Sequence, residues 1–249
     1  MAVIIIKKRT LCMVLTLLLA LALLFATYQF SYHPRLVQSV NQPHIIRDVK
    51  VTRKAVAFTF DDGPDPQGTL AILKVLKKHQ AKATFFMVGT QVRKYPEVAR
   101  QVAREGHEIG NHGYHHNYRT YCNLEQALHD IKLNEALIHS ITGQRPKLLR
   151  PPGGFLADGL VESSQKHGFN IVFWSWIQDT KDWKNPPAHR QAEHILRNIK
   201  PGQILIFHDG GGERTQTVET LDMCLERLAV EGYRFVTISE LLRMERHLE

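Results

Sequence analysis

Short apolar runs alternate with amphipathic stretches along most of this chain. Runs with the composition of buried strands span residues 55–60, 83–88, 107–110, 147–150, 170–176, 203–207 and 233–238. Between them, apolar residues recur at helical spacing in the stretches 67–79, 91–104, 123–141, 158–167, 188–199 and 215–230, and a last helical stretch starts at Ser239. Seven successive strand and helix units predict an α/β domain with a parallel sheet, which is either open or closed into a barrel.

The first thirty residues differ from this alternation. An almost uninterrupted apolar stretch from Leu11 to about Ala26 follows the basic cluster Lys7-Lys8-Arg9. With its flanks, the stretch approaches the roughly 20 residues that a helix needs to cross a bilayer, and the basic cluster predicts a cytoplasmic N-terminus. It is either an uncleaved membrane anchor or a secretory signal peptide. Ala20-Leu21-Ala22 resembles a cleavage site but lies inside the apolar run, which favours the anchor, and either way we expect the remainder to be exported.

The pattern divides the chain into three segments. Residues 1–30 are expected to be the membrane anchor or signal peptide, and residues 31–54, with Pro34 and Pro43, are expected to be a stem. Residues 55–249 are long enough for one domain with a substantial core. We therefore expect a single folded domain after the stem.

Polar clusters fall where the predicted strands end. In a barrel of parallel strands, the carboxyl ends of the strands meet at one mouth, where catalytic residues gather. Clusters from five strands would therefore converge, namely Asp61-Asp62 and His208-Asp209 together with residues 112–116, 150–154 and 179–183. This convergence favours one functional site over five unrelated surface features.

Asp61 and Asp62 follow the first apolar run directly. Because side chains alternate along a strand, the two carboxylates can point in different directions, so that one could hold a metal ion while the other moves a proton. Helix capping is the alternative explanation, but Asp65 and Pro66 already supply the N-cap and the first-turn proline of the next helix. Capping of the following helix is also the alternative for His208 and Asp209, and it is more plausible for Asp209 than for His208.

Histidine is concentrated between residues 112 and 116. His112 and His116 lie four residues apart, a spacing that can turn both rings toward one metal ion. An isolated pair of histidines more often belongs to the surface or to a satisfied core. Two histidines together with one aspartate, however, form a three-ligand set that leaves coordination positions open for water, which is typical of a catalytic site.

In their order and spacing, the five clusters resemble the motifs of the polysaccharide deacetylases of the NodB-homology type, carbohydrate esterase family 4. The family motifs are TFDDG, H(S/T)xxH, RxPY, DxxDW and LxH. Over roughly residues 55–243 this chain has, in the same order, Thr59–Gly63, His112–His116, Arg150–Gly153, Asp179–Trp183 and Ile206–His208. The resemblance implies a distorted (β/α) barrel and an enzyme that removes N-acetyl groups from a polysaccharide.

The resemblance also implies the roles of the central residues. Asp62, His112 and His116 would hold one divalent metal ion, Zn²⁺ or Co²⁺, which would lower the pKa of bound water toward about 7. Asp61 would act as the general base, and His208 would act as the general acid for the departing amine. Together these five residues would hydrolyse an N-acetyl amide.

Four further residues receive supporting roles by the same resemblance. Arg150 would orient the general base, and Asp182 would favour the protonated form of the general acid. The backbone N–H of Gly153 would donate to the oxyanion, and Trp183 would offer an apolar face to a sugar ring. Without the order of the motifs, Arg150 could equally be a surface ion-pair partner and Trp183 a core residue.

Three positions depart from the family motifs. Gly113 stands where the second motif has Ser or Thr, so a hydroxyl that could brace the metal loop is absent. Gly153 stands where the third motif has an aromatic residue, which removes one wall of the groove, and Ile206 conservatively replaces leucine. None of these changes removes an implied metal ligand, the base or the acid, so we expect an active enzyme.

Charge and export narrow the choice of partner. The chain carries a formal net charge of +8, and because residues 1–30 hold Lys7, Lys8 and Arg9 but no acid, the rest carries +5. A mildly basic exported domain suits an anionic surface such as a cell wall. Export and the lack of a basic stripe with interleaved aromatic residues argue against nucleic acid. We expect peptidoglycan as the first candidate substrate and chitooligosaccharide as the second.

Two functions from different classes remain open. The first is metal-dependent hydrolysis of N-acetyl groups from an N-acetylated cell-wall polysaccharide, with release of acetate, and the second is a catalytically silent glycan-binding protein with the same barrel. The expected location is the cell membrane, as a single-pass protein with an extracytoplasmic catalytic domain, or outside the cell if the N-terminal helix is cleaved. In an exported domain Cys122 and Cys224 could form a disulfide, although their separation in sequence does not show it.

Overall fold

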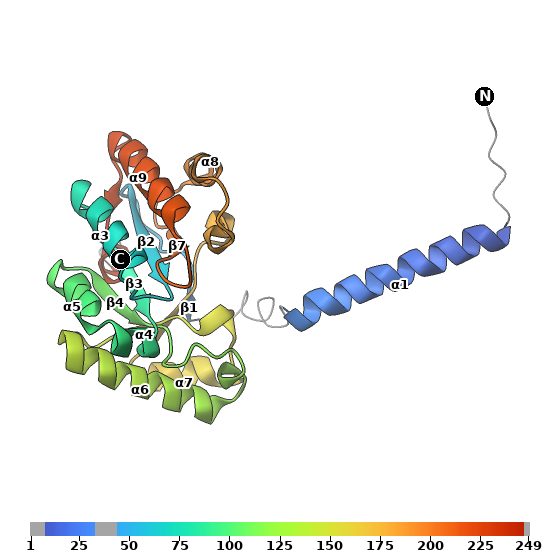
Figure 1. Cartoon of the computed structure of the whole chain (residues 1–249), viewed down its shortest axis with the longest axis horizontal. Coiled ribbons are helices and arrows are strands. Elements are labelled where there is room, and N and C mark those ends of the chain that lie inside the picture. Colours follow the sequence, from blue (N-terminus) through green and yellow to red (C-terminus); the bar gives the residue numbers. More distant parts are fainter. Residues whose placement is uncertain (1–7, 33–43, 247–249) are drawn as a thin grey trace. The chain divides into compact units, whose positions relative to one another are not determined.

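The computed structural model describes residues 8–32 and 44–246. The chain divides into two compact units, with the division between Gln42 and Pro43. The first unit contains the described helix α1 (Lys8–Tyr32), whose segment Lys8–Phe25 is long and apolar enough to cross a membrane (Figure 1). A secretory signal has the same length and composition, so this helix fits both of its expected roles. Of the expected stem, residues 33–43 lie outside the described residues.

The second unit is built on a parallel sheet. Seven strands lie inside their expected ranges or within one residue of them: β2 (Ala55–Asp61), β3 (Thr84–Met87), β4 (Glu108–Asn111), β5 (Leu148–Leu149), β6 (Asn170–Val172), β7 (Ile204–His208) and β8 (Arg234–Phe235). A further strand, β1 (Ile45–Ile46), pairs with β6 and was not expected, because two residues are too few to show a period. The strand order is β1-β6-β5-β4-β3-β2-β7, with β8 paired to β2, and all of these pairs are parallel.

The two terminal strands of this order, β1 and β7, are linked through the residues that flank them. Asp48 forms an isolated antiparallel bridge with Gln203, and the N–H of Val49 donates to the carbonyl oxygen of Gly202 at 2.9 Å. The sheet therefore curls into an incompletely closed barrel, and helices lie around it (Figure 1). This architecture is the distorted (β/α) barrel that the sequence predicts, and part of the expected stem belongs to it.

Helices follow the strands in the expected order: α3 (Gly68–Lys78), α4 (Gly89–Lys94), α5 (Pro96–Arg104), α6 (Leu124–Thr142), α7 (Leu160–Lys166), α8 (Ala188–Asn198), α9 (Thr215–Val230) and α10 (Ile238–Arg246). The single helix expected over residues 91–104 is wrong, because two helices, α4 and α5, occupy this range. Proline disfavours the helical conformation in the residue before it, and Tyr95, which precedes Pro96, has a φ of −129°. The chain therefore turns at this point.

Side-chain caps begin two of these helices, and the cap at Asp65 is the one that the sequence indicates. Asp65 Oδ1 accepts hydrogen bonds from the N–H groups of Gln67 and Gly68, at 2.8 Å each, where α3 starts. The side chain of Asn123 accepts one from Gln126 at the start of α6, and Gly143 ends α6 in the left-handed conformation. Because Asp65 caps α3, Asp61 and Asp62 are left for another role.

Short 3-10 helices shape the loops after three of the strands. They are η1 (Thr120–Cys122) after β4, η2 (Pro152–Gly154) after β5, and η3 (Trp176–Gln178) and η4 (Asp182–Lys184) after β6. Runs of three residues carry too little pattern to be expected from the sequence.

Cys122 in η1 is exposed and Cys224 in α9 is buried, and both are free, so these two residues do not form a disulfide.

Strand β2 shows how the apolar pattern positions the site. All of its residues are buried, because the strand lies between β3 and β7 and is covered on both faces. Phe58 and Phe60 join the apolar cluster that packs against the helices, whereas Ala55 and Ala57 join a second cluster inside the barrel. Side chains alternate along a strand, so Asp61 belongs to the inward-facing set.

Candidate active site

The register of the sheet brings the polar clusters to one edge. Asp61, the last residue of β2, is the direct partner of His208, the last residue of β7. His112 follows β4 and Arg150 follows β5, and both strands run parallel to β2. Since parallel strands end at the same edge of a barrel, side chains from four strand ends meet there.

Arg150 lies against Asp61 inside the barrel. Its side chain is fully buried, and Nη1 donates hydrogen bonds to Asp61 Oδ1 at 2.7 Å and to the Thr59 hydroxyl at 2.8 Å. Nε and Nη2 donate to the carbonyl oxygens of Val172 and Phe173, at 3.2 and 2.8 Å. These bonds fix the guanidinium, which in turn holds one oxygen of Asp61 in place.

Asp62, His112 and His116 turn toward one another. His116 Nε2 lies 2.9 Å from Asp62 Oδ1, and His112 Nε2 lies 3.5 Å from the same oxygen. One ligand atom from each residue lies within 4.8 Å of the other two, and among the described residues this is the one such group of three. Asp62 and His116 reach this arrangement with left-handed φ angles of 75° and 53°. The structure thus brings together the three residues that the sequence predicts as ligands.

The hydrogen bonds around this group suit a cation. His112 Nδ1 lies 2.6 Å from the carbonyl oxygen of Arg150, so Nδ1 carries a proton, and in the neutral ring Nε2 presents its lone pair to the carboxylate. Asp62 Oδ1 is buried, and the nitrogen atoms that approach it are Nε2 of His116 and Nε2 of His112. A lone pair that faces an unsatisfied carboxylate oxygen is unfavourable unless a cation lies between them, so the donor set fits a metal ion.

Asp209 does not cap the following helix, as the sequence suggested, because α9 starts well downstream. Its buried carboxylate instead accepts hydrogen bonds from the N–H of Gly63, at 3.0 Å, and from the Thr69 hydroxyl. Its own N–H donates to the carbonyl oxygen of Asp61 at 3.0 Å. Burial raises the pKa of Asp209 to about 7, although the hydrogen bond from Thr69 lowers it. The negative charges of Asp62 and Asp61 also raise this pKa. Asp209 thus secures the turn that carries both aspartates.

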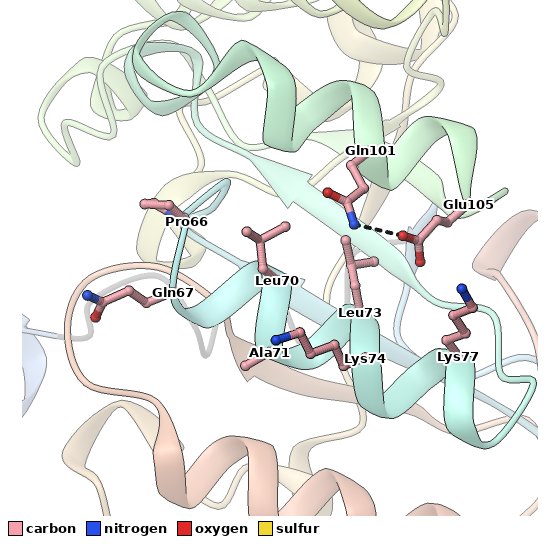
Figure 2. Close-up of a pocket in the computed structure, with 9 residues that line it drawn as sticks. All are labelled: Pro66, Gln67, Leu70, Ala71, Leu73, Lys74, Lys77, Gln101 and Glu105. Carbon is pink, nitrogen blue, oxygen red and sulfur yellow. Dashed lines mark hydrogen bonds between the residues drawn. The ribbon is translucent and has the colours of Figure 1, made fainter.

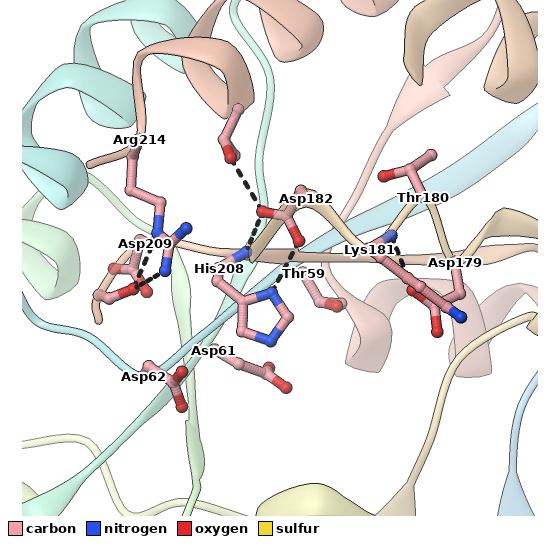
Figure 3. Close-up of polar contacts among 12 residues, drawn as sticks. Thr59, Asp61, Asp62, Asp179, Thr180, Lys181, Asp182, His208, Asp209 and Arg214 are labelled. Carbon is pink, nitrogen blue, oxygen red and sulfur yellow. Dashed lines mark hydrogen bonds and ion pairs between the residues drawn. The ribbon is translucent and has the colours of Figure 1, made fainter. Parts of the chain in front are cut away.

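His208 is paired with Asp182. His208 Nδ1 lies 2.7 Å from Asp182 Oδ1, and Asp182 Oδ2 accepts hydrogen bonds from the His208 N–H and the Thr217 hydroxyl, at 2.9 Å each. Figure 3 shows the imidazole between Asp182 and the pair Asp61 and Asp62. Burial alone would lower the pKa of His208, but the hydrogen bond and charge of Asp182, aided by the other two aspartates, raise it to about 9. The ring is therefore a cation at neutral pH.

Gly153 and Trp183, the expected substrate contacts, lie in separate loops at this edge. Gly153 is part of η2 and has a φ of 61°, and a Cβ there would lie 3.1 Å from ring atoms of Tyr118 and Phe155. Trp183 is part of η4, and 52% of its surface is exposed. Tyr118 is a residue of this edge that the sequence interpretation missed, although it lies two residues beyond the second histidine of the predicted ligand set.

A separate hollow of about 420 Å³ lies between α3 and α5 (Figure 2). Its lining is Pro66, Gln67, Leu70, Ala71, Leu73, Lys74, Lys77, Gln101 and Glu105. Gln101 Nε2 donates a hydrogen bond to Glu105 Oε1 at 2.9 Å. None of the lining residues belongs to the groups described above, so the candidate active site is the sheet edge and not this hollow.

Comparison with known proteins identifies the family. The family described as polysaccharide deacetylase matches residues 48–172. The chain is also 42% identical over 200 residues to a peptidoglycan-N-acetylglucosamine deacetylase of Bacillus cereus, with 80% of this chain and 93% of the relative covered. This chain belongs to the polysaccharide deacetylase family. The family named from the sequence motifs is thereby confirmed.

Two further members extend the comparison. A chitooligosaccharide deacetylase of Bradyrhizobium sp. is 34% identical over 206 residues, with 78% of this chain and 93% of the relative covered. The crystal structure of the Bc1960 peptidoglycan N-acetylglucosamine deacetylase matches with a TM-score of 0.78 at 33% identity, and the match covers 84% of this chain and 97% of that chain. The structural match confirms the expected fold of this polysaccharide deacetylase.

Proposed function

We propose that this polysaccharide deacetylase hydrolyses the N-acetyl groups of an N-acetylated cell-wall glycan with the help of a divalent metal ion and releases acetate. The observation that carries the proposal is the meeting of three groups at one sheet edge. These groups are a three-ligand set, a carboxylate held by an arginine, and a histidine held by a second carboxylate. Amide hydrolysis needs an electrophilic aid, a base and an acid, and each group can supply one of them.

Asp62, His112 and His116 would hold the metal ion. Two imidazole nitrogens and one carboxylate oxygen suit Zn²⁺ or Co²⁺, and three protein ligands leave further positions open. An ion held there would supply polarisation of an acetyl carbonyl and acidification of bound water. The carbonyl oxygen of Arg150 holds the Nδ1 side of His112, so the ring keeps Nε2 turned toward the other ligands.

Asp61 would be the general base. Its Oδ1 accepts the hydrogen bond from Arg150, whereas Oδ2 lies 3.9 Å from His112 Nε2 and thus faces the ligand set. Because Oδ1 is bound to the guanidinium, Oδ2 is the atom that can accept a proton from water. The two neighbouring carboxylates would therefore have different tasks, with Asp62 as a ligand and Asp61 as the base.

His208 would be the general acid. Asp182 binds Nδ1 and keeps the ring protonated at neutral pH, since the pKa of His208 is about 9. The proton on Nε2 is then available to the nitrogen that leaves as an amine. The backbone N–H of Gly153 would donate to the oxyanion, and Trp183 would pack against a sugar ring.

Peptidoglycan is the proposed substrate, and chitooligosaccharide is the alternative. The printed names of the relatives refer to both polymers, and the net charge of +5 beyond the first thirty residues suits an anionic wall. Helix α1 would hold the protein at the outer face of the cell membrane as a single-pass anchor, or be cleaved to leave it secreted. Residues 1–30 would then be the anchor or signal peptide and residues 55–249 the catalytic domain. Of the expected stem, residues 31–54, the part that contains β1 would belong to that domain.

Acetate release from peptidoglycan and from chitin oligomers, measured side by side with the products identified by mass, tests this proposal. We expect the wild-type protein to release acetate, to lose this activity with a chelator, and to regain it with added Zn²⁺ or Co²⁺. Asp61→Asn should stay inactive with either ion. If metal-loaded wild-type protein bound glycan but released no acetate from either polymer, a glycan-binding function would replace the enzymatic one.

A further inference from the structure

The ring of Tyr118 lies between a proposed metal ligand and the loop that follows β5. Its centroid is 5.4 Å from that of the His116 ring, with an edge-to-face angle of 65°. The same ring stacks on Phe155, with 5.3 Å between centroids and 17° between planes. A Cβ on Gly153 would lie 3.1 Å from ring atoms of both Tyr118 and Phe155. The two rings therefore occupy the space that a side chain at residue 153 would need.

The backbone conformation of the loop after β5 disfavours a side chain at residue 153, which leaves this space to the two rings. Gly153 has a φ of 61°, in the left-handed region that few residues with a Cβ adopt. A larger side chain at this position would be strained and would also push against Tyr118 and Phe155. The loop after β4, through Tyr118, thus supplies an aromatic surface at a place where η2 has only glycine.

Tyr118 is exposed to solvent as well as packed. About half of its surface, 48%, is accessible. Within the described residues 44–246, the exposed aromatic side chains are those of Tyr118, Trp176 and Trp183, and all three lie in the loops after β4 and β6. Exposed apolar surface that gathers at one edge indicates a contact surface, and aromatic rings present flat apolar faces to which the C–H faces of sugars can pack.

We propose that Tyr118, supported by Phe155, forms the wall of the glycan groove beside the metal ligands and contacts the sugar that carries the acetyl group. This inference rests on the proposed function. An acetyl carbonyl that reaches both the ligand set and the N–H of Gly153 lies next to Tyr118, because this ring adjoins His116 on one element and Gly153 on another. The sugar attached to that acetyl group then packs on the exposed part of the ring. Tyr118 binds substrate in this arrangement and moves no proton.

Two substitutions at Tyr118 distinguish an effect of the ring on substrate binding from an effect on the catalytic step. In Tyr118→Ala we expect the KM for a chitin oligomer to rise about ten-fold, with kcat changed by less than about three-fold. Tyr118→Phe keeps the ring and loses only the hydroxyl, so its KM should stay within about two-fold of wild type. Leu133→Ala removes a comparably exposed side chain from α6 and is the matched control, for which we expect no change. All three variants should bind Zn²⁺ with wild-type affinity in titration calorimetry of the apo-protein.

The outcomes distinguish this inference from the proposed function. If the wild-type protein releases no acetate, the proposed function fails, and direct titration with the chitin oligomer still tests the wall, since Tyr118→Ala should bind it about ten-fold more weakly. If the wild-type protein is active and Tyr118→Ala keeps the wild-type KM, the proposed wall is wrong. A fall in Zn²⁺ affinity without a rise in KM would assign the ring to the support of His116 and would also overturn the proposal. Should Tyr118→Ala not fold, Tyr118→Leu, which keeps apolar bulk without a flat face, should raise KM in the same way.

Discussion

The hydroxyl of Tyr121 occupies the space beside Gly113 in which a side chain would otherwise begin. Gly113 has a φ of 76°, and a Cβ on it would collide with this hydroxyl and lie 2.7 Å from Asp130 Oδ2. The hydroxyl donates a hydrogen bond to the same carboxylate oxygen at 3.1 Å. The hydroxyl that is missing from residue 113 is therefore replaced by one that comes from η1.

Asp130 connects this tyrosine to the loop between the two proposed histidine ligands. Its carboxylate, on α6, is buried and accepts hydrogen bonds from the N–H groups of Tyr114 and His115, at 2.7 and 3.3 Å. A further contact of this carboxylate is with His115 Nδ1, at 2.7 Å. One buried carboxylate thus holds the residues between His112 and His116, and the distance between the two ligands depends on it.

Asp130→Asn should weaken Zn²⁺ binding by about 10- to 100-fold, because the amide keeps the shape of the side chain but has only one oxygen to accept hydrogen bonds from the loop. Titration calorimetry of the apo-protein measures this affinity, and circular dichroism establishes that the variant is folded. Tyr121→Phe removes a single donor and should change the affinity much less. Wild-type Zn²⁺ affinity in folded Asp130→Asn would contradict the bracing role of this carboxylate.

The adjacent aspartates should respond differently to the same substitution. Asp61→Asn should lower kcat by about 100-fold or more while it leaves Zn²⁺ affinity near wild type, because the variant loses the proposed base and none of the proposed ligands. Asp62→Asn should lower Zn²⁺ affinity, and a higher Zn²⁺ concentration should restore part of its activity. Calorimetry and acetate release on the same preparations test both statements. The reverse result, with metal binding lost in Asp61→Asn and kept in Asp62→Asn, would exchange the two assignments.

The raised pKa of His208 predicts the alkaline limb of the pH–rate profile. In the proposed role of His208 the protonated ring is the active form, so kcat should fall as the pH rises through about 9. Asp182→Asn removes the charge and the hydrogen-bond acceptor that raise this pKa, and the fall should then occur at lower pH. Measurement of kcat from about pH 6 to about pH 10 covers the alkaline limb of the wild-type protein and that of the variant. An alkaline limb that stayed near pH 9 in Asp182→Asn would argue against the pairing as its cause.

His107 predicts a loss of stability in mild acid that is separate from catalysis. The side chain is buried, Nδ1 accepts a hydrogen bond from the N–H of Ala83 at 3.3 Å, and burial together with the charge of Lys82 lowers the pKa of His107 to about 4. The unfolded chain takes up this proton near pH 6.5 and the folded chain only near pH 4, so the free energy of unfolding falls over that window and is unaffected above it. The fall amounts to about 3 kcal/mol.

Urea denaturation of the wild-type protein and of His107→Gln, at about pH 7 and about pH 5, measures this effect. The glutamine variant should show a smaller loss of stability between the two pH values, because it has no group to titrate there. Equal losses in both proteins would assign the acid sensitivity to other residues.

Much of the fold could be predicted because most strands are covered on both faces. Such strands are short, continuous apolar runs bounded by polar clusters, and β2, β3 and β7 have this pattern. Strand β1 escaped prediction because two residues show no period, and its place in the sheet depends on pairing with β6, more than a hundred residues away. The break between α4 and α5 was a local signal that could have been used, since Pro96 forces it.

The sequence by itself determined which residues stand at the strand ends. Successive parallel strand and helix units place every strand end at one edge, so the order of the motifs was enough to gather Asp61, Asp62, His112, His116 and His208 there. The local pattern also separated Asp65, which caps α3, from the two aspartates before it.

Only the tertiary structure decided how these residues contact one another. Strands β5 and β2 are separated by β4 and β3, and a flat sheet would hold them about 14 Å apart. Arg150 reaches Asp61 at 2.7 Å because the sheet curls and its inward-facing side chains converge. In the same way, Tyr118 beside Gly153 and the Tyr121 hydroxyl beside Gly113 fill spaces next to glycines in contacts that depend on how the loops pack. Such contacts join residues that no local period relates, so the folded chain alone defines them.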